Sequence, residues 1–322
     1  MDPDQTMVKA LAAVVAEWAR EAKKRTKKAR RKRTDALVHD DRTALRRLRV
    51  ALCVMGSTVY RRSVVVPLEQ CVHDIEDALG PTRDADVLLA DVIRYGRAHG
   101  NEAEALRPLI RRLEKRRSQS ARRMHERLSS ARARRTFDAI ERFLERGAKT
   151  RLPRDPSKAV PLLVRHFLRH EIWRGYDELL SYDTHVPADY ASLHRIRAAA
   201  RRLRYRLELF EGALGDTEPI ASQLRQVQDE LGDLHDHHVA VTTIEDLLAE
   251  GKVNDGEEVL AYVQGRREGR ARALRAAEPH WRALLGASFR AKVNEAVETV
   301  RSPAEPPNSW LTSKISPQHR PS

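Results

Sequence analysis

The sequence is poor in the residues that mark several classes of protein. Aromatic residues fill only 5% of its 322 positions, which argues against a platform for stacking the bases of single-stranded nucleic acid. Two cysteines, Cys53 and Cys71, are too few for a disulfide scaffold, so a reducing cytoplasm is the simpler context. No apolar run approaches the roughly 18 residues of a membrane span, and Asp2 and Asp4 stand where a signal peptide would be basic. We therefore expect a cytoplasmic protein that uses no membrane.

Strand-like runs are also missing, and glycine and proline are scarce within the periodic segments, so the pattern is helical throughout. Gly80-Pro81 is expected to end one helix, and Gly215 and Pro219 to bracket a turn. Residues 302–322 hold five of the 15 prolines and are expected to be a disordered tail. The periodicity predicts helices over 6–32, 36–62, 65–79, 83–98, 101–147, 158–182, 190–213, 218–231, 235–250 and 255–300.

What the chain has in excess is positive charge. Its formal net charge is +14 and its pI is about 10.1, which points to a polyanionic partner. Two segments carry this excess, because residues 23–33 hold nine basic residues and no acid, and residues 107–135 hold twelve basic residues and two acids. Arginine outnumbers lysine 48 to 12, which reflects either an arginine-favouring genome or the bidentate binding of phosphate oxygens.

Two parts of the chain share one pattern. His39 is followed by arginines at +3, +7, +8 and +10, and His194 is followed by arginines at the same four offsets. About forty residues further on, residues 79–87 resemble residues 231–239. Two matches at nearly equal spacing indicate an internal duplication.

We therefore predict an all-α protein made of two helical bundles related by a pseudo-twofold axis. Residues 1–150 would form the first half, residues 151–301 the second half, and residues 302–322 the tail.

The repeated residues fall on one face of each helix. At about 100° per residue, positions 0, +3, +7 and +10 share an arc of roughly 80°, and they span about 15 Å of helix. Tyr205 falls within the second copy and adds a hydroxyl donor, whereas Val50 holds that place in the first. The first stripe is His39, Arg42, Arg46 and Arg49, and the second stripe is His194, Arg197, Arg201 and Arg204.

A solvated helix face is the simplest interpretation of such a stripe. Solvated faces normally mix charges of both signs, however, and residues 194–206 contain six arginines and no acid. Stacked arginines repel one another, so an anion that neutralises them explains why both halves keep the pattern. Glu208 lies near the second stripe and could hold Arg204 in place.

The motifs Val-His-x-x-Arg-x-x-x-Arg-Arg-Leu-Arg and Leu-His-x-x-Arg-x-x-x-Arg-Arg-Leu-Arg-Tyr, with Leu-Gly-x-x-Arg-Asp-x-Asp-Val, resemble the CHAD family, the "conserved histidine α-helical domain". The resemblance covers about residues 7–300. It implies two related helical bundles around a basic central channel that binds inorganic polyphosphate, often at polyphosphate granules. It also implies the channel-lining residues, which are His39, Arg42, Arg46, Arg47, Arg49, His194, Arg197, Arg201, Arg202, Arg204 and Tyr205.

The sequence departs from the family pattern at three positions. Asp41 stands where an apolar residue is usual, and we expect it to weaken packing there; Arg201 stands where lysine is common, which keeps the charge. His235 replaces the more usual asparagine, so no role is assigned to it. The two histidines of the stripes either contact the ligand or organise the bundle by bonding to a neighbouring helix. Asp84 and Asp86 are expected to cap a helix start and to orient channel arginines.

No catalytic, metal or cofactor site stands out. Residues 235–238 are rich in histidine, but local spacing alone is weak support for zinc. Phosphate-cradling glycine loops, the nucleophile elbow and the Glu-x-Glu-x-Lys motif of triphosphatase-type domains do not occur. We therefore expect a non-catalytic polyphosphate-binding protein without a cofactor. The alternatives are a non-specific binder of RNA or DNA backbones, an enzyme acting on polyphosphate, and a scaffold for acidic proteins.

Overall fold

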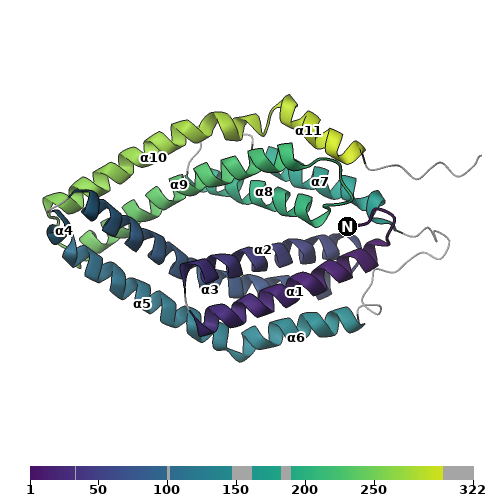
Figure 1. The fold of residues 1–322 in the computed structure, drawn as a ribbon, viewed down its shortest axis with the longest axis horizontal. Coiled ribbons are helices and arrows are strands. Elements are labelled where there is room, and N and C mark those ends of the chain that lie inside the picture. Colours follow the sequence, from purple (N-terminus) through teal and green to yellow (C-terminus); the bar gives the residue numbers. More distant parts are fainter. Residues whose placement is uncertain (33, 100–101, 147–161, 183–189, 300–322) are drawn as a thin grey trace, which may run out of the picture.

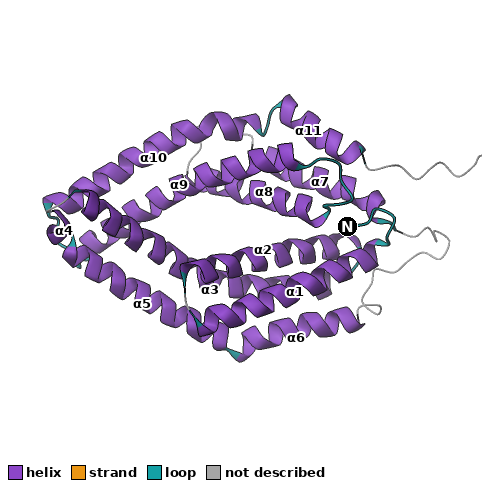
Figure 2. Cartoon of the chain, in the orientation of Figure 1, coloured by secondary structure: helices purple, strands orange, loops and turns teal. Residues whose placement is uncertain are grey.

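The computed structural model describes residues 1–32, 34–99, 102–146, 162–182 and 190–299, and these residues form helices and loops without a strand (Figure 2). The disordered tail predicted at 302–322 lies outside the described residues, as do the break near residue 153 and the boundary between the two halves. The helices are α1 (Met7–Arg31), α2 (Asp35–Thr58), α3 (Arg62–Ala98), α4 (Glu102–Ala105), α5 (Arg107–Ser129), α6 (Ala131–Arg146), α7 (Val164–Leu180), α8 (Tyr190–Leu209), α9 (Glu218–Ala249), α10 (Glu257–Ala283) and α11 (Ala287–Glu298). The all-α class is confirmed.

Two expected helix breaks are wrong. Helix α3 runs without interruption through Gly80 and Pro81, and α9 runs through Gly232. In the described chain only Gly212 and Gly251 have a positive φ, so Gly80 does not form a left-handed cap. Proline removes one intrahelical hydrogen bond, but buried residues on both sides of Pro81 hold α3 in place through tertiary packing. Packing therefore overrides the local stop signal.

Two expected long helices are instead divided. The helix predicted over 101–147 is split into α4, α5 and α6, and Ser130 in extended conformation ends α5. The helix predicted over 255–300 is split at Gly286, which precedes α11 in extended conformation. The predicted turn between Gly215 and Pro219 is confirmed, since Pro219 stands in the first turn of α9, where its missing N–H costs no helical bond.

The second half repeats the helix contacts of the first. Helix α2 packs against α1 and α3, and α8 packs against α7 and α9 in the same way. The long helices α3 and α9 then pack against α5 and α10, respectively. Figure 1 shows these halves as two layers whose long helices converge near α4. The pseudo-twofold axis itself stays a prediction.

The apolar core consists of two clusters, and each cluster includes residues of both halves. Along α3 the buried residues change from the first cluster at Leu79 to the second at Leu88. Along α9 the same change falls between Leu234 and Ala240. The helical turns of α3 and α9 between the two clusters therefore hold polar side chains at the centre of the molecule.

Asp41 is fully buried where α2 packs on α1. Its carboxylate accepts a hydrogen bond from Thr26 Oγ1 at 2.8 Å. Burial raises the pKa of Asp41 to about 7, against the opposing effects of Thr26 and Arg25. The departure from the family pattern therefore places a buried carboxyl group in the first turns of α2, and its expected effect on packing stays a prediction.

Candidate polyanion-binding site

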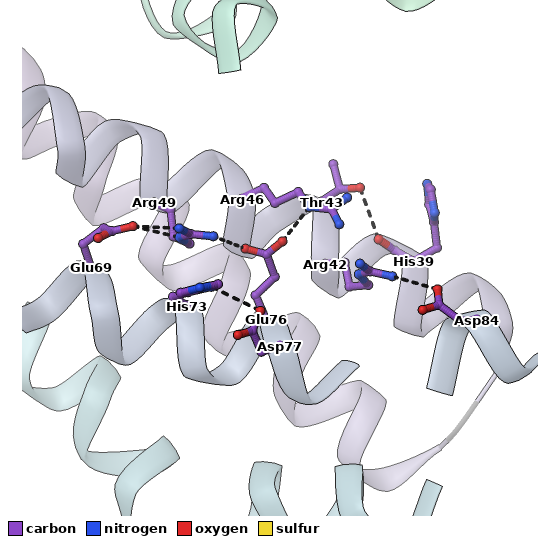
Figure 3. A network of polar contacts seen from close by, with 10 residues as sticks. All are labelled: His39, Arg42, Thr43, Arg46, Arg49, Glu69, His73, Glu76, Asp77 and Asp84. Carbon is purple, nitrogen blue, oxygen red and sulfur yellow. Dashed lines mark hydrogen bonds and ion pairs between the residues drawn. The ribbon is translucent and has the colours of Figure 1, made fainter. Parts of the chain in front are cut away.

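The first arginine stripe lies along the face of α2 that meets α3. Arg46 Nε donates to Glu76 Oε1 at 2.6 Å, and Arg49 Nη1 donates to Glu76 Oε2 at 2.7 Å. Arg49 also pairs with Glu69 at 2.9 Å. Figure 3 shows Glu76 between the two guanidinium groups. The stripe is thus not a surface of donors alone, because α3 supplies carboxylates that neutralise part of it.

The second stripe lies on α8 and has fewer acidic partners. Arg197 Nε donates to the backbone carbonyl of Gln228 at 3.2 Å, and Arg204 Nε donates to the side-chain oxygen of Gln228 at 3.3 Å. Arg204 also pairs with Glu208, as the sequence suggested. In the described chain no hydrogen-bond acceptor or carboxylate pairs with Arg201. Carboxylates act on Arg201 and Arg197 only without direct pairing, so this half of the site is less completely neutralised than the first.

The two stripes face each other across the α2–α8 contact. Burial, together with the positive charges of Arg46 and Arg197, lowers the pKa of Arg42 to about 10. Burial likewise lowers the pKa of Arg201 to about 9, with repulsion from Arg46 and Arg197 adding to the effect. Four arginines predicted from the sequence are therefore close enough to repel one another.

A cavity of about 130 Å³ opens between α2, α3 and α8. Arg46 and Arg49 line it from α2, and Arg201, Arg202 and Tyr205 line it from α8. Tyr205 is only 2% exposed, and the Arg204 guanidinium lies 4.6 Å from its ring centroid. The tyrosine thus forms part of the cavity wall beneath the arginines.

Two of the predicted arginines lie at the edge of this cluster. Arg47 is exposed, and its Nε donates to Glu208 of α8 at 2.7 Å, which ties the two halves together. Arg202 pairs with Glu178 of α7 at 2.5 Å. Both arginines therefore have partners in the protein, and they are less available to a ligand than Arg201.

The histidines of the stripes are exposed at the start of each stripe. Figure 3 shows the His39 ring directed away from Asp84, and no described side chain bonds to it. Burial and nearby arginines lower the pKa values of His39 and His194. Both rings are therefore neutral at pH 7, and each can still donate from one nitrogen. Within the described chain neither ring makes a hydrogen bond to a neighbouring helix, but the His194 ring lies 5.9 Å from the His235 ring of α9, so both alternatives for the histidines stay open.

Asp84 and Asp236 occupy matching places on α3 and α9, close to the arginines. Asp84 lies 4.0 Å from Arg42. Burial raises the pKa of Asp84, and it raises that of Asp236 to about 6, with Arg197 opposing the shift. The expected capping role of Asp84 and Asp86 is wrong, because both lie in the interior of α3, and Asp86 accepts a hydrogen bond from Arg117 of α5. The expected orienting role is consistent with the ion pair of Asp84.

Sequence reasoning missed three residues of the site. Glu76 and Gln228 both stand four positions before the glycine of the shared Leu-Gly motif, so a longer comparison of the two halves would have aligned them. Tyr190 stands one turn before His194, and its hydroxyl bonds to the His235 ring. Its ring stacks on His238 at 3.5 Å. The first half has Asp35 at the place of Tyr190, so the duplication carried no signal for it.

A second cavity, of about 470 Å³, lies between α3, α5 and α9. Arg112, Arg116 and Arg123 line it from α5, and Asp84 lines it from α3. Part of the basic segment 107–135 therefore faces the space next to the arginine stripes.

Among the described residues, no three histidine, cysteine, aspartate or glutamate side chains converge as metal ligands, and the histidines near residue 235 do not form such a group. Within the same residues, no helix is both long and apolar enough to span a bilayer.

Comparison with known proteins points to one family. The family model described as "CHAD domain" matches residues 9–245. The chain is similar to the crystal structure of the CHAD domain from the plant Ricinus communis, with a TM-score of 0.65, 22% identity, and coverage of 91% of this chain and 93% of that chain. It is also similar to PptA from Streptomyces chartreusis, with a TM-score of 0.65, 17% identity, and coverage of 87% and 99%. These structural similarities support the fold, and no curated protein matches the chain.

Proposed function

This chain belongs to the CHAD-domain family, and we propose that it binds inorganic polyphosphate without catalysing a reaction. The ligand would lie along the two facing stripes, between α2 and α8, in a basic central channel. A protein with this affinity would collect on polyphosphate granules in the cytoplasm.

The incomplete neutralisation of the arginine cluster carries this proposal. Burial and the nearby charge of Arg46 lower the pKa values of Arg42, Arg197 and Arg201, and Arg201 makes no hydrogen bond or ion pair with a described residue. Burying cations beside one another costs free energy unless anions compensate for them. A bound phosphate chain would supply that compensation at several points at once.

Polyphosphate fits this arrangement because it carries closely spaced charges along a flexible chain. Each charge-assisted hydrogen bond contributes roughly 1.5–3 kcal/mol, and arginine forks bind phosphate oxygens bidentately. Release of counterions from the polyanion adds a favourable entropy that falls as salt increases. The arginines of α5 would extend the same surface beyond the stripes.

Non-specific binding of RNA or DNA backbones is the alternative. The arginines alone do not distinguish a nucleic acid from a base-free phosphate chain. Tyr205, the aromatic residue that lines the α2–α8 cavity, is buried, so it offers little face for stacking a base. Polyphosphate is therefore the better fit.

A binding role is also the better fit than catalysis. The side chains that line the cavity are mainly cations, and its carboxylates, Glu69 and Glu76, are engaged in ion pairs. Polyphosphate cleavage would need a nucleophile with a base, or carboxylates that hold metal ions.

The test is a comparison of binding to long-chain polyphosphate, single-stranded RNA and duplex DNA at several salt concentrations. We expect tight binding of polyphosphate with a steep salt dependence, and a large loss in the Arg46→Glu/Arg201→Glu variant. Arg272→Glu/Arg275→Glu on α10 is the matched control, because both arginines are exposed away from the stripes. Equal affinity for RNA at matched charge and salt would favour the nucleic-acid alternative. Steady release of orthophosphate would show an enzyme instead.

A further inference from the structure

A second basic surface lies on the outside of the first half, apart from the stripes. Lys24, Lys27, Lys28 and Arg31 are all exposed on α1. Their spacing of three and four residues places them on one face of the helix. No described carboxylate pairs with any of them. They form a continuous row of cations, which we call the outer row.

The outer row borders a groove between α1 and α6. The groove has a volume of about 240 Å³, and its cations are Lys23, Lys27 and Arg30 from α1 and Arg134 from α6. Asp138 and the apolar residues Leu128, Ala133 and Phe137 also line it. Lys23 closes the wall between the helices, because it pairs with Asp138 at 3.4 Å and with Glu141 at 2.8 Å. Arg134 bonds to the backbone carbonyl of Ser129 at 2.6 Å and to no carboxylate. None of the groove residues lines the cavity between α2 and α8.

Local helix stability does not account for the outer row. Cations in the last turn of a helix are favoured by its dipole, but this effect fades within one turn. In α1 the last turn contains Lys28, Arg30 and Arg31. Lys24 and Lys27 lie further from the end, and like charges three and four residues apart destabilise a helix. The outer row therefore destabilises α1, and no carboxylate among the described residues pairs with it to offset the repulsion.

The equivalent helices of the second half lack this charge. Helix α1 has nine basic and two acidic residues, whereas α7 has three of each. Helix α6 has five basic and three acidic residues, whereas α11 has two of each. The duplication preserved the inner stripes in both halves, but the outer row belongs to the first half alone. The outer row and its groove are thus separate from the stripes and share no lining residue with the α2–α8 cavity.

We propose that the α1–α6 groove and the outer row bind a second segment of polyphosphate, so that one protein molecule links two phosphate chains. This proposal rests on the proposed function for the identity of the ligand. Lysine ammonium groups act as point charges toward phosphate, and the groove's one aromatic residue, Phe137, is buried. A base-free phosphate chain therefore suits the surface better than a strand with bases to stack. Two separate sites on one protein convert binding into cross-linking.

The first measurement is the number of short polyphosphate chains bound per protein, determined by titration at fixed low salt. We expect two for the wild type. We expect one for Lys24→Gln/Lys27→Gln/Lys28→Gln, and one for Arg46→Glu/Arg201→Glu. The matched control, Arg267→Gln/Arg272→Gln/Arg275→Gln, removes the same charge from exposed positions of α10 and should still bind two. Circular dichroism checks that each variant is folded.

The second measurement is light scattering on mixing with long-chain polyphosphate. Wild type and control should form large assemblies, and both site variants should scatter at least about tenfold less, because a protein with one site cannot link chains. The proposal is overturned if the outer variant still binds two short chains, if the wild type binds only one, or if the outer site prefers single-stranded RNA at equal charge and salt. If the outer variant binds one chain but Arg46→Glu/Arg201→Glu still binds two, the outer site is supported and the stripe site of the proposed function is contradicted.

Discussion

On α2 the arginines of the stripe are held by Glu76, whereas Gln228 occupies the same place next to α8. One carboxylate therefore pairs directly with Arg46 and Arg49, while Arg201 is influenced by it without an ion pair or hydrogen bond. The two stripes share their cations and differ in the groups that pair with them. This difference shows that the protein itself pairs the arginines of the first stripe with a carboxylate, and that the second stripe has an amide at the same place.

The largest expected effect is a difference in polyphosphate affinity between substitutions of Arg46 and Arg201, which stand at the same place in the two stripes. Arg201→Ala should weaken polyphosphate binding by about 10- to 150-fold, the equivalent of one charge-assisted hydrogen bond of roughly 1.5–3 kcal/mol. It should leave the unfolding midpoint unchanged or raise it, since a repelled charge is removed. Arg46→Ala should weaken binding less and lower stability, because Glu76 is left buried with one partner fewer. Titration calorimetry and thermal unfolding measure both effects, and equal losses of affinity would contradict the difference between the halves.

A smaller effect follows from exchanging the residues that differ. Gln228→Glu should place a carboxylate beside Arg204, raise the unfolding midpoint, and weaken polyphosphate binding by about tenfold through the loss of one charge-assisted contact. Glu76→Gln should do the opposite, with lower stability and tighter binding. The two variants are each other's control, since each changes one charge at the same place in the repeat. Changes in the same direction would show that the place is not equivalent in the two halves.

The smallest expected effect depends on pH. Asp236 faces Arg197 on α8, Asp84 and Arg83 on α3, and Asp233 on its own helix, and its pKa is about 6. The raised pKa means that Asp236 stabilises the fold only while protonated, and this contribution is lost as the pH rises through about 6. Lowering the pH from about 7.5 to about 5.5 should therefore strengthen polyphosphate binding, as the acid becomes neutral.

The control for this pH effect is Asp236→Asn. The variant should bind more tightly than wild type at pH 7.5 and should show a weaker dependence on pH. A residual rise toward acidic pH is expected from His39 and His194, because burial and nearby arginines lower their pKa values and their protonation then adds positive charge to the stripes. An unchanged pH profile in the variant would assign the whole effect to the histidines.

The helical class and the two stripes could be predicted from the sequence, because both follow from periodicity within one helix. His39 to Arg49 and His194 to Arg204 lie where the spacing placed them. The neutralising partners could not be predicted in this way. Glu76 reaches Arg46 across 30 positions, and such a contact depends on how α2 packs against α3.

The error at Gly80-Pro81 has the same origin. Glycine and proline favour the end of a helix locally. This preference predicts a real helix end only where the segments on either side pack against the protein as two separate helices. Here both sides of Pro81 are buried against other helices. The tertiary contacts of α3 therefore decide the outcome, and these contacts are not visible in a single segment.

Because α3 is one continuous helix, it fixes the positions of the side chains that contact three other helices. Along this one helix, Glu76 bonds to α2, Asp86 bonds to Arg117 of α5, and Asp91 bonds to Tyr262 of α10 at 2.6 Å. A residue added or removed near Pro81 would turn the later acids by about 100° relative to Glu76. The stripe would keep its partner while α5 and α10 lost theirs. The rotational position of the side chains along α3 thus couples the contacts of the arginine stripes to the contacts with α5 and α10.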